Sequence, residues 1–225
     1  YQGNADGYID YICKTVLPAV QEEGLADAVD VFCENIAFNV AQATKIFEAA
    51  QAFNLPIKCH AEQISNMGGS QLAAKYGARS CEHLEFIDEQ GVRALADNQV
   101  VAVLLPGAFY FLRETQKPPI DLFRKYNVPM AIATDCNPGS SPTTSLPLMM
   151  NMACTFFGLT VAEVWQAVTT HAALALGMTE PSLQIGSEAT FVLWPFTDPV
   201  DLVYTVGQFE RPKVFIKGQQ FARHQ

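Results

Sequence analysis

Short apolar segments that stop at a polar residue constrain the fold of this chain most strongly. The segments span residues 29–34, 55–60, 78–83, 100–105 and 128–134. Continuous apolar runs of this length are typical of strands buried on both faces of a sheet. Three of them lead directly into His60, His83 and Asp135. The sequence therefore predicts a buried sheet with reactive side chains at its strand ends.

Helical segments alternate with these strands. The expected helices span residues 39–53, 70–76, 88–98 and 120–126. Strands that alternate with helices pair in parallel, with the helices outside the sheet. Because the active site of a (β/α) barrel lies at the carboxyl ends of its strands, the three polar strand ends favour that fold. A doubly wound sheet would need a glycine-rich phosphate turn after an early strand, which the sequence lacks.

Three further local expectations follow from single residues. Residues 7–23 predict a helix that Asp6 or a neighbour caps and that Pro18 breaks or kinks. Residues 108–119 read as a long aromatic loop. Residues 161–176 read as one helix between a threonine cap and a terminal glycine.

The sequence changes character after residue 177. Two strand signals, at 186–194 and 213–218, are separated by a proline-rich turn that we expect to contain no helix. We therefore predict two parts: a portion of a metal-dependent barrel at 1–179, and a small β element at 180–225.

Composition narrows the range of partners. Of 225 residues, 49% are hydrophobic and 16% charged, and the net charge is −9 with scattered basic residues. Nucleic acids and anionic membranes are therefore not expected as partners. No apolar run reaches the roughly 18 residues of a membrane span, and the six cysteines form no CxxC pair. We expect a cytoplasmic protein with reduced thiols.

The three strand-end residues suit metal-assisted chemistry. A neutral imidazole such as His60 or His83 binds metal or shuttles protons, and each could instead be a hydrogen-bonded structural histidine. The Asp135 carboxylate would be costly to bury without a cation or donors. A catalytic zinc takes three protein ligands and a water. The chain has no H-x-H pair, so we expect the missing ligands outside it; His171 reads as structural and His224 lies in the tail.

Several runs resemble one known family. They are HAEQISNMGG at 60–69, EHLE at 82–85, LLPGAFYFLRET at 104–115 and TDCNPGSSP at 134–142. These runs resemble the imidazolonepropionases of the amidohydrolase superfamily. The resemblance implies an α/β fold, a TIM-like (β/α)8 barrel joined to a small β-sandwich. This chain would supply about strands 4–8 and the C-terminal strands of the sandwich, without the N-terminal half that carries H-x-H.

The resemblance also implies a reaction and residue roles. The reaction is hydrolysis of the cyclic amide 4-imidazolone-5-propanoate to N-formimidoyl-L-glutamate in histidine degradation, with zinc or iron as the metal. His60 and Asp135 would be the metal ligands present, and Asp135 and His83 the acid–base groups. The implied substrate contacts are Gln63, Asn137, Gly139 and Ser140. Some family members carry Glu at the position of Gln63, which puts in doubt any scheme that needs a carboxylate there.

Two other functions stay open at this point. A cytosine- or guanine-type deaminase would share the metal-site residues but not the Asn137-Pro138-Gly139 loop. A metal-free assembly subunit, or a non-catalytic barrel fragment, would keep the fold without the chemistry. We expect the isolated chain to be inactive. Its expected partner is a small-molecule substrate, and a homodimer is one of the assemblies left open.

Overall fold

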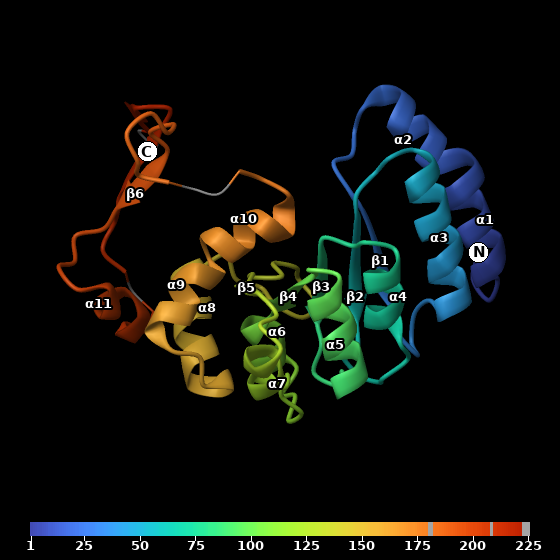
Figure 1. Cartoon of the computed structure of the whole chain (residues 1–225), viewed down its shortest axis with the longest axis horizontal. Helices are drawn as coiled ribbons and strands as arrows, with labels where there is room; N and C mark the ends of the chain where they lie inside the picture. Colours follow the sequence, from blue (N-terminus) through green and yellow to red (C-terminus); the bar gives the residue numbers. More distant parts are fainter. Residues whose placement is uncertain (180–181, 208, 222–225) are drawn as a thin grey trace.

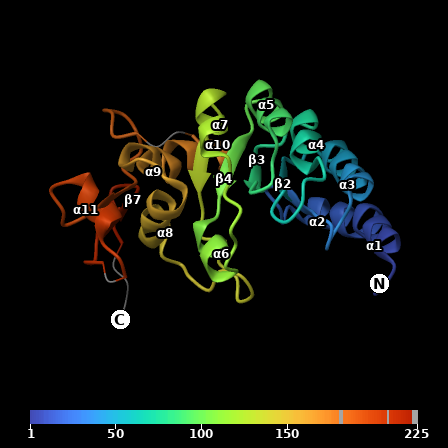
Figure 2. The ribbon, with the colours of Figure 1, turned by 90° about the horizontal axis from the view of Figure 1, so that it is seen from below.

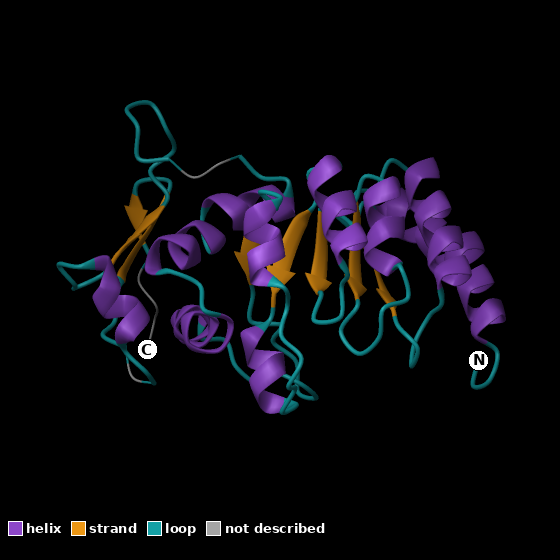
Figure 3. Ribbon diagram, turned by 60° about the horizontal axis from the view of Figure 1, so that its bottom comes forward, coloured by secondary structure: helices purple, strands orange, loops and turns teal. Residues whose placement is uncertain are grey.

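A parallel sheet forms the centre of the molecule. The computed structural model describes residues 1–179, 182–207 and 209–221. The strands are β1 (Val29–Cys33), β2 (Ile57–Ala61), β3 (Ser80–His83), β4 (Val101–Leu104) and β5 (Met130–Ile132). They lie in sequential order, each pairing in parallel with the next. Their arrowheads share one edge (Figure 3), which confirms the parallel sheet and brings the predicted strand ends together.

The two faces of the sheet have different surroundings. Side chains such as Val31, Cys59 and Cys81 belong to the main core between the sheet and its helices. That core is covered by α3 (Val40–Ala52), α4 (Gly69–Lys75), α5 (Glu89–Asp97) and α7 (Ile120–Lys125), which follow one another along the sheet (Figure 2). Asp30, Lys58 and their neighbours occupy the alternate positions and therefore face the other way. We call this second face the inner face.

Side-chain caps fix where these outer helices begin. Asn39 and Gln42 form a reciprocal capping box at the start of α3, and the Asp88 side chain accepts from the Gly91 N–H at the start of α5. Each such cap satisfies donors that the first helical turn leaves unpaired. The sequence placed both helices correctly because their caps and apolar periodicity agree.

The N-terminal helix is interrupted, as Pro18 predicted. It consists of α1 (Ala5–Tyr11), the π-helical segment η1 (Ile12–Val16) and α2 (Leu17–Glu23). Pro18 has no N–H to donate to the preceding turn, and a widened turn before it accommodates this loss. Asn4 is the cap of α1, and the Asp6 carboxylate instead accepts from Gln42 Nε2 at 2.8 Å.

Two expectations for the middle of the chain were wrong. Where an aromatic loop was expected, α6 (Pro106–Phe111) forms, because Pro106 suits the first helical turn and Phe109 is buried. The single helix expected at 161–176 is two helices, α9 (Val161–Ala167) and α10 (Thr170–Leu176). At the break the Thr169 hydroxyl donates to the Trp165 carbonyl at 2.6 Å, so its side chain competes with the helical ladder.

The break lets α10 cross the amino ends of the strands, opposite the predicted site. The His171 ring lies 2.9 Å, Nδ1 to oxygen, from the carbonyl of Met130 at the start of β5. Arg79, just before β3, donates to the carbonyl of Leu176 at 3.0 Å. Ala175 packs with the inner-face residues of β4 and β5. The structural role predicted for His171 agrees with this contact.

A second, antiparallel sheet lies beyond α9. It contains β6 (Phe191–Leu193), β7 (Lys213–Ile216) and β8 (Gln219–Gln220), and it lies at the opposite end of the molecule from α1 (Figure 1). Contrary to expectation, α11 (Pro199–Tyr204) lies between β6 and β7, with Pro199 in its first turn and the Asp198 side chain as its cap. The domain boundary at 179/180 stays a prediction, because residues 180–181 lie outside the described residues. His224 also lies outside them.

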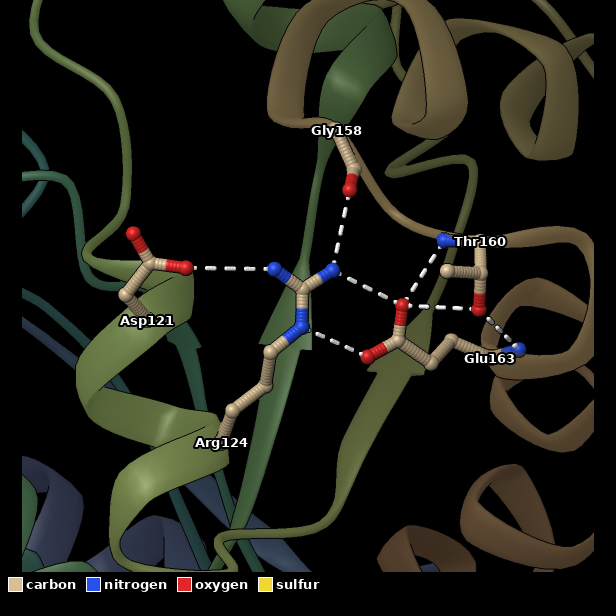
Figure 4. A network of polar contacts seen from close by, with 5 residues as sticks. All are labelled: Asp121, Arg124, Gly158, Thr160 and Glu163. Carbon is tan, nitrogen blue, oxygen red and sulfur yellow. Dashed lines mark hydrogen bonds and ion pairs between the residues drawn. The ribbon is translucent and has the colours of Figure 1, made fainter.

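An ion-pair network ties the outer helices together around Arg124 (Figure 4). Its guanidinium contacts both Glu163 oxygens, with Nε 2.7 Å from Oε1 and Nη2 2.9 Å from Oε2. Glu163 also closes the capping box of Thr160 at the start of α9. The network therefore joins α7 to α9 and to α8 (Leu146–Met152) through the π-helical segment η2 (Ala153–Phe157), whose terminal Gly158 accepts from Arg124. Within the described part of the chain, no helix has the length and hydrophobicity to cross a membrane.

Candidate active site

Left-handed backbone at the strand ends changes the direction in which the candidate side chains point. Glu62, His83 and Asp135 have φ values of 52°, 77° and 49°. Non-glycine residues rarely adopt this conformation, and it concentrates where function requires a particular side-chain direction. Strict alternation along β3 would put His83 on the face opposite Glu82. The turn instead leaves the His83 ring 5.5 Å from the His60 ring.

His60 lies on the inner face and has an acidic environment. Its Nδ1 lies 2.7 Å from Asp30 Oδ2 and 3.9 Å from Glu82 Oε2. Burial by itself lowers the pKa of the imidazole, but the hydrogen bond and charge of Asp30, with the charges of Glu82 and Asp135, raise the net pKa. Asp135 follows β5 at the same edge of the parallel sheet as His60.

His83 is the more buried of the two histidines. Burial, reinforced by the charge of His60, lowers its pKa to about 3. Its Nδ1 has no hydrogen-bond partner among the described residues and lies 3.9 Å from Glu85 Oε2. At neutral pH His83 is therefore a neutral imidazole, and its Nδ1 is available to a further group.

Asp135 leads into a loop that is organised by one side chain. Burial raises the pKa of Asp135, and the charge of His60 together with Asn137 and Ser140 opposes that rise. Asn137 Oδ1 accepts from the N–H groups of Gly139 and Ser140 at 2.9 and 2.8 Å, and its Nδ2 donates to the Asp135 carbonyl. The predicted substrate residues thus form one preorganised turn, with the Asn137 amide committed to it.

Glu62 and Gln63 point to different parts of the structure. The buried Glu62 carboxylate accepts from the N–H groups of Gly69 and Ser70 at 2.7 and 2.9 Å, at the start of α4. Glu62 is therefore a structural cap. Gln63 Nε2 donates to Glu114 Oε1 at 2.9 Å, beside a cavity of about 230 Å³ that Gln63, Arg113 and Glu114 help to line.

Sequence reasoning missed five acidic side chains of this region. They are Asp30, Glu34, Glu82, Glu85 and Glu114. Glu34 accepts from the N–H groups of Ile64 and Ser65 and so shapes the loop that follows β2. For Asp30 and Glu82 the available signal was a charged residue within a strand, as in the β1 sequence VDVFC. Such a signal identifies a position that needs a polar partner. It does not identify the partner residue, because that residue lies on the neighbouring strand.

The donor types and positions fit a metal ion. Imidazole and carboxylate are ligands of zinc and iron, and His60 and Asp135 provide them from two strand ends. Ligand atoms of Asp30, His60 and Glu82 lie within 4.8 Å of one another. Glu82 Oε2 and His83 Nδ1 are buried without a hydrogen-bond partner among the described residues. Such orphaned polar atoms are expected where a site is completed by further groups.

Comparison with known proteins agrees with this geometry. The model of the amidohydrolase family matches residues 21–214. The imidazolonepropionase of Cupriavidus metallidurans is 55% identical, over 99% of this chain and 56% of its own length. That of Legionella pneumophila strain Lens is 58% identical, over 91% of this chain and 51% of its own length. The chain thus spans about half the length of the curated relatives it matches.

Solved structures confirm the fold. An adenosine deaminase from Xanthomonas campestris with bound zinc has a TM-score of 0.68 at 18% identity, over 91% of this chain and 55% of its own. A triazine hydrolase from Arthrobacter aurescens has a TM-score of 0.73 at 15% identity, over 94% of this chain and 55% of its own. The five parallel strands are therefore part of a TIM-like barrel architecture. The chain belongs to the amidohydrolase family, and within it the sequence is similar to the imidazolonepropionases.

Proposed function

We propose that this chain carries part of the active site of an imidazolonepropionase, which hydrolyses 4-imidazolone-5-propanoate to N-formimidoyl-L-glutamate. One observation carries the proposal: the residues that resemble the family motifs meet at one edge of the sheet. The His60 and His83 rings lie 5.5 Å apart, and Asp135 follows β5, which runs parallel to the other strands of the sheet. A cytoplasmic location and a homodimer stay predictions of the sequence.

A divalent metal, zinc or iron, held by His60 and Asp135 would polarise the ring carbonyl and activate water. The zinc named for the adenosine deaminase supports a metal of this kind. Asp135, whose pKa burial raises, accepts the proton of the attacking water as its oxygen bonds to the carbonyl carbon. The ring C–N bond then breaks, and the proton passes to the leaving nitrogen.

The other residues bind and orient the substrate. Neutral His83 would hydrogen-bond the carbonyl oxygen, where negative charge develops in the transition state. The turn at Asn137, Gly139 and Ser140 would contact the substrate propanoate, and its shape is held by the N–H groups of Gly139 and Ser140 that donate to Asn137 Oδ1. Gln63, fixed by Glu114, offers its amide oxygen to a ring N–H.

The test is complementation. The purified 225-residue chain should show no turnover, because two ligands do not form a closed catalytic metal site. Co-expression with a segment that supplies the first barrel strands and an H-x-H pair should restore hydrolysis of 4-imidazolone-5-propanoate. The matched chain with Asp135→Asn should not be restored. Turnover by the isolated chain at the rate of the complemented protein would refute the proposal, and turnover of cytosine or guanine instead would assign a deaminase.

A further inference from the structure

A polar group on the inner face is not used by the proposed chemistry. The sequence of β1 is VDVFC, in which Asp30 interrupts an apolar strand. Strand register places Asp30 opposite Lys58, and places His60 opposite Glu82. A charge at such a position is expected to have a specific partner, because an uncompensated charge beside an apolar core is costly.

The partner of Asp30 is His60, and the geometry of the contact shows which group donates the hydrogen bond. Asp30 Oδ2 lies 2.7 Å from His60 Nδ1. An ionised carboxylate only accepts hydrogen bonds, so Nδ1 carries the hydrogen. In the neutral ring the lone pair is then on Nε2. Asp30 therefore leaves free the nitrogen that can bind a metal.

Glu82 is too far from His60 to take this role. Its Oε1 lies 2.7 Å from Lys58 Nζ and accepts from the Ser80 hydroxyl at 2.6 Å. Its Oε2 lies 3.9 Å from His60 Nδ1, beyond hydrogen-bond distance. Lys58 and Glu82 thus neutralise each other beside the Asp30–His60 pair.

We propose that Asp30 is a positioning residue that holds His60 in the Nδ1–H tautomer and orients its Nε2 for a divalent metal. The inference rests on the proposed function, because it takes His60 as a metal ligand. Phe32 adds a second restraint, since its ring packs edge-on against the His60 ring at a centroid distance of 6.5 Å. When a carboxylate that hydrogen-bonds a metal-bound imidazole is removed, metal affinity typically falls roughly 10- to 100-fold.

Nitrogen NMR of the histidine-labelled, metal-free chain at alkaline pH tests this directly, with His60 assigned by comparison with His60→Ala. The wild type should have hydrogen on Nδ1. Asp30→Ala and the strand-compatible Asp30→Val should shift His60 towards the Nε2–H tautomer. Asp30→Asn, whose side-chain oxygen still accepts, should retain Nδ1–H. The exposed Asp27→Asn, three residues earlier in the chain, is the matched control and should match the wild type.

Zinc affinity, measured by competition with a chromophoric chelator, provides the second readout. Asp30→Ala and Asp30→Val should bind zinc roughly 10- to 100-fold more weakly, with Asp30→Asn between them and the wild type. Circular dichroism identifies the variants that fold. An unchanged tautomer and unchanged affinity in a folded Ala or Val variant would overturn the proposal, as would a tautomer change in Glu82→Gln. Neither readout uses substrate, so failure of the proposed hydrolysis is distinguishable from failure of this inference.

Discussion

Among single residues, Glu85 has the clearest consequence for stability. Its side chain is 1% exposed, and neither carboxyl oxygen has a hydrogen-bond partner among the described residues. Burial, reinforced by the nearby Glu114, raises its pKa to about 9. Glu85 is therefore a neutral acid in the folded protein at physiological pH.

This shift predicts a pH dependence. Between the ordinary pKa of 4.5 and the folded value of about 9, the folded state holds a proton on Glu85 that the unfolded state has lost. The free energy of unfolding should therefore fall as pH rises through that window. Glu85→Gln, which cannot ionise, should flatten the dependence in urea titrations. The exposed Glu22→Gln serves as control, and equal slopes in the two variants would contradict the prediction.

The turn around Asn137 supports a prediction about binding. Asn137→Ala removes the oxygen that accepts from Gly139 and Ser140. The turn is accessible to water, so the free energy of unfolding should drop by no more than about 1 kcal/mol. In the complemented enzyme the KM should rise about tenfold, because the turn that contacts the substrate is no longer held in one conformation. An unchanged KM in the alanine variant would count against the assigned role.

At the scale of elements, the Arg124–Glu163 pair connects α7 and α9. Arg124→Lys loses the two-pronged contact with the carboxylate, and we expect it to lower the free energy of unfolding by about 1 kcal/mol. Glu163→Ala should cost more, because it also removes the acceptor of the backbone N–H of Thr160. The measurement is the urea midpoint, with Arg93→Lys as control, whose contact with Glu89 is longer at 3.5 Å.

The same pair predicts acid sensitivity. The hydrogen bond to Arg124 lowers the pKa of Glu163 to about 2, against an ordinary 4.5. Its stabilising contribution is therefore present above pH 4.5 and lost as pH falls towards 2. The difference in stability between the wild type and Glu163→Gln should shrink over that interval. A constant difference would show that the charge of Glu163 does not contribute to stability.

At the scale of the molecule, the five-stranded sheet has two open edges, at β1 and β5. A closed barrel has no open edges. In the proposed enzyme, further strands would close the sheet around the inner face. Zinc should raise the melting temperature of the isolated chain only slightly, since stabilisation follows RT ln(1 + [L]/Kd) and two ligands give weak binding. Complementation with an H-x-H segment should enlarge the shift, and His60→Ala should abolish it. A large shift for the isolated chain would contradict this view.

Much of the fold could be predicted because it depends on local patterns. Apolar runs located the strands, while caps and periodicity located the outer helices. The errors arose where tertiary packing overrode local signals. Burial of Phe109 favours the helix α6 where a loop was expected. The Thr169 hydroxyl bonds to the backbone where the helix expected at 161–176 is broken. The second sheet was predicted without α11, because a proline-rich segment reads as a turn although Pro199 suits a first helical turn.

The sequence by itself determined the parallel strands, the family resemblance and the identity of His60, His83 and Asp135 as strand-end residues. These follow from residue type and order along the chain. Only the tertiary structure decided that Asp30 supports His60, that Glu62 caps α4 and that Gln63 is fixed by Glu114. The physical reason is that these contacts depend on strand register and on left-handed backbone at the strand ends. Both are set by packing between segments far apart in sequence.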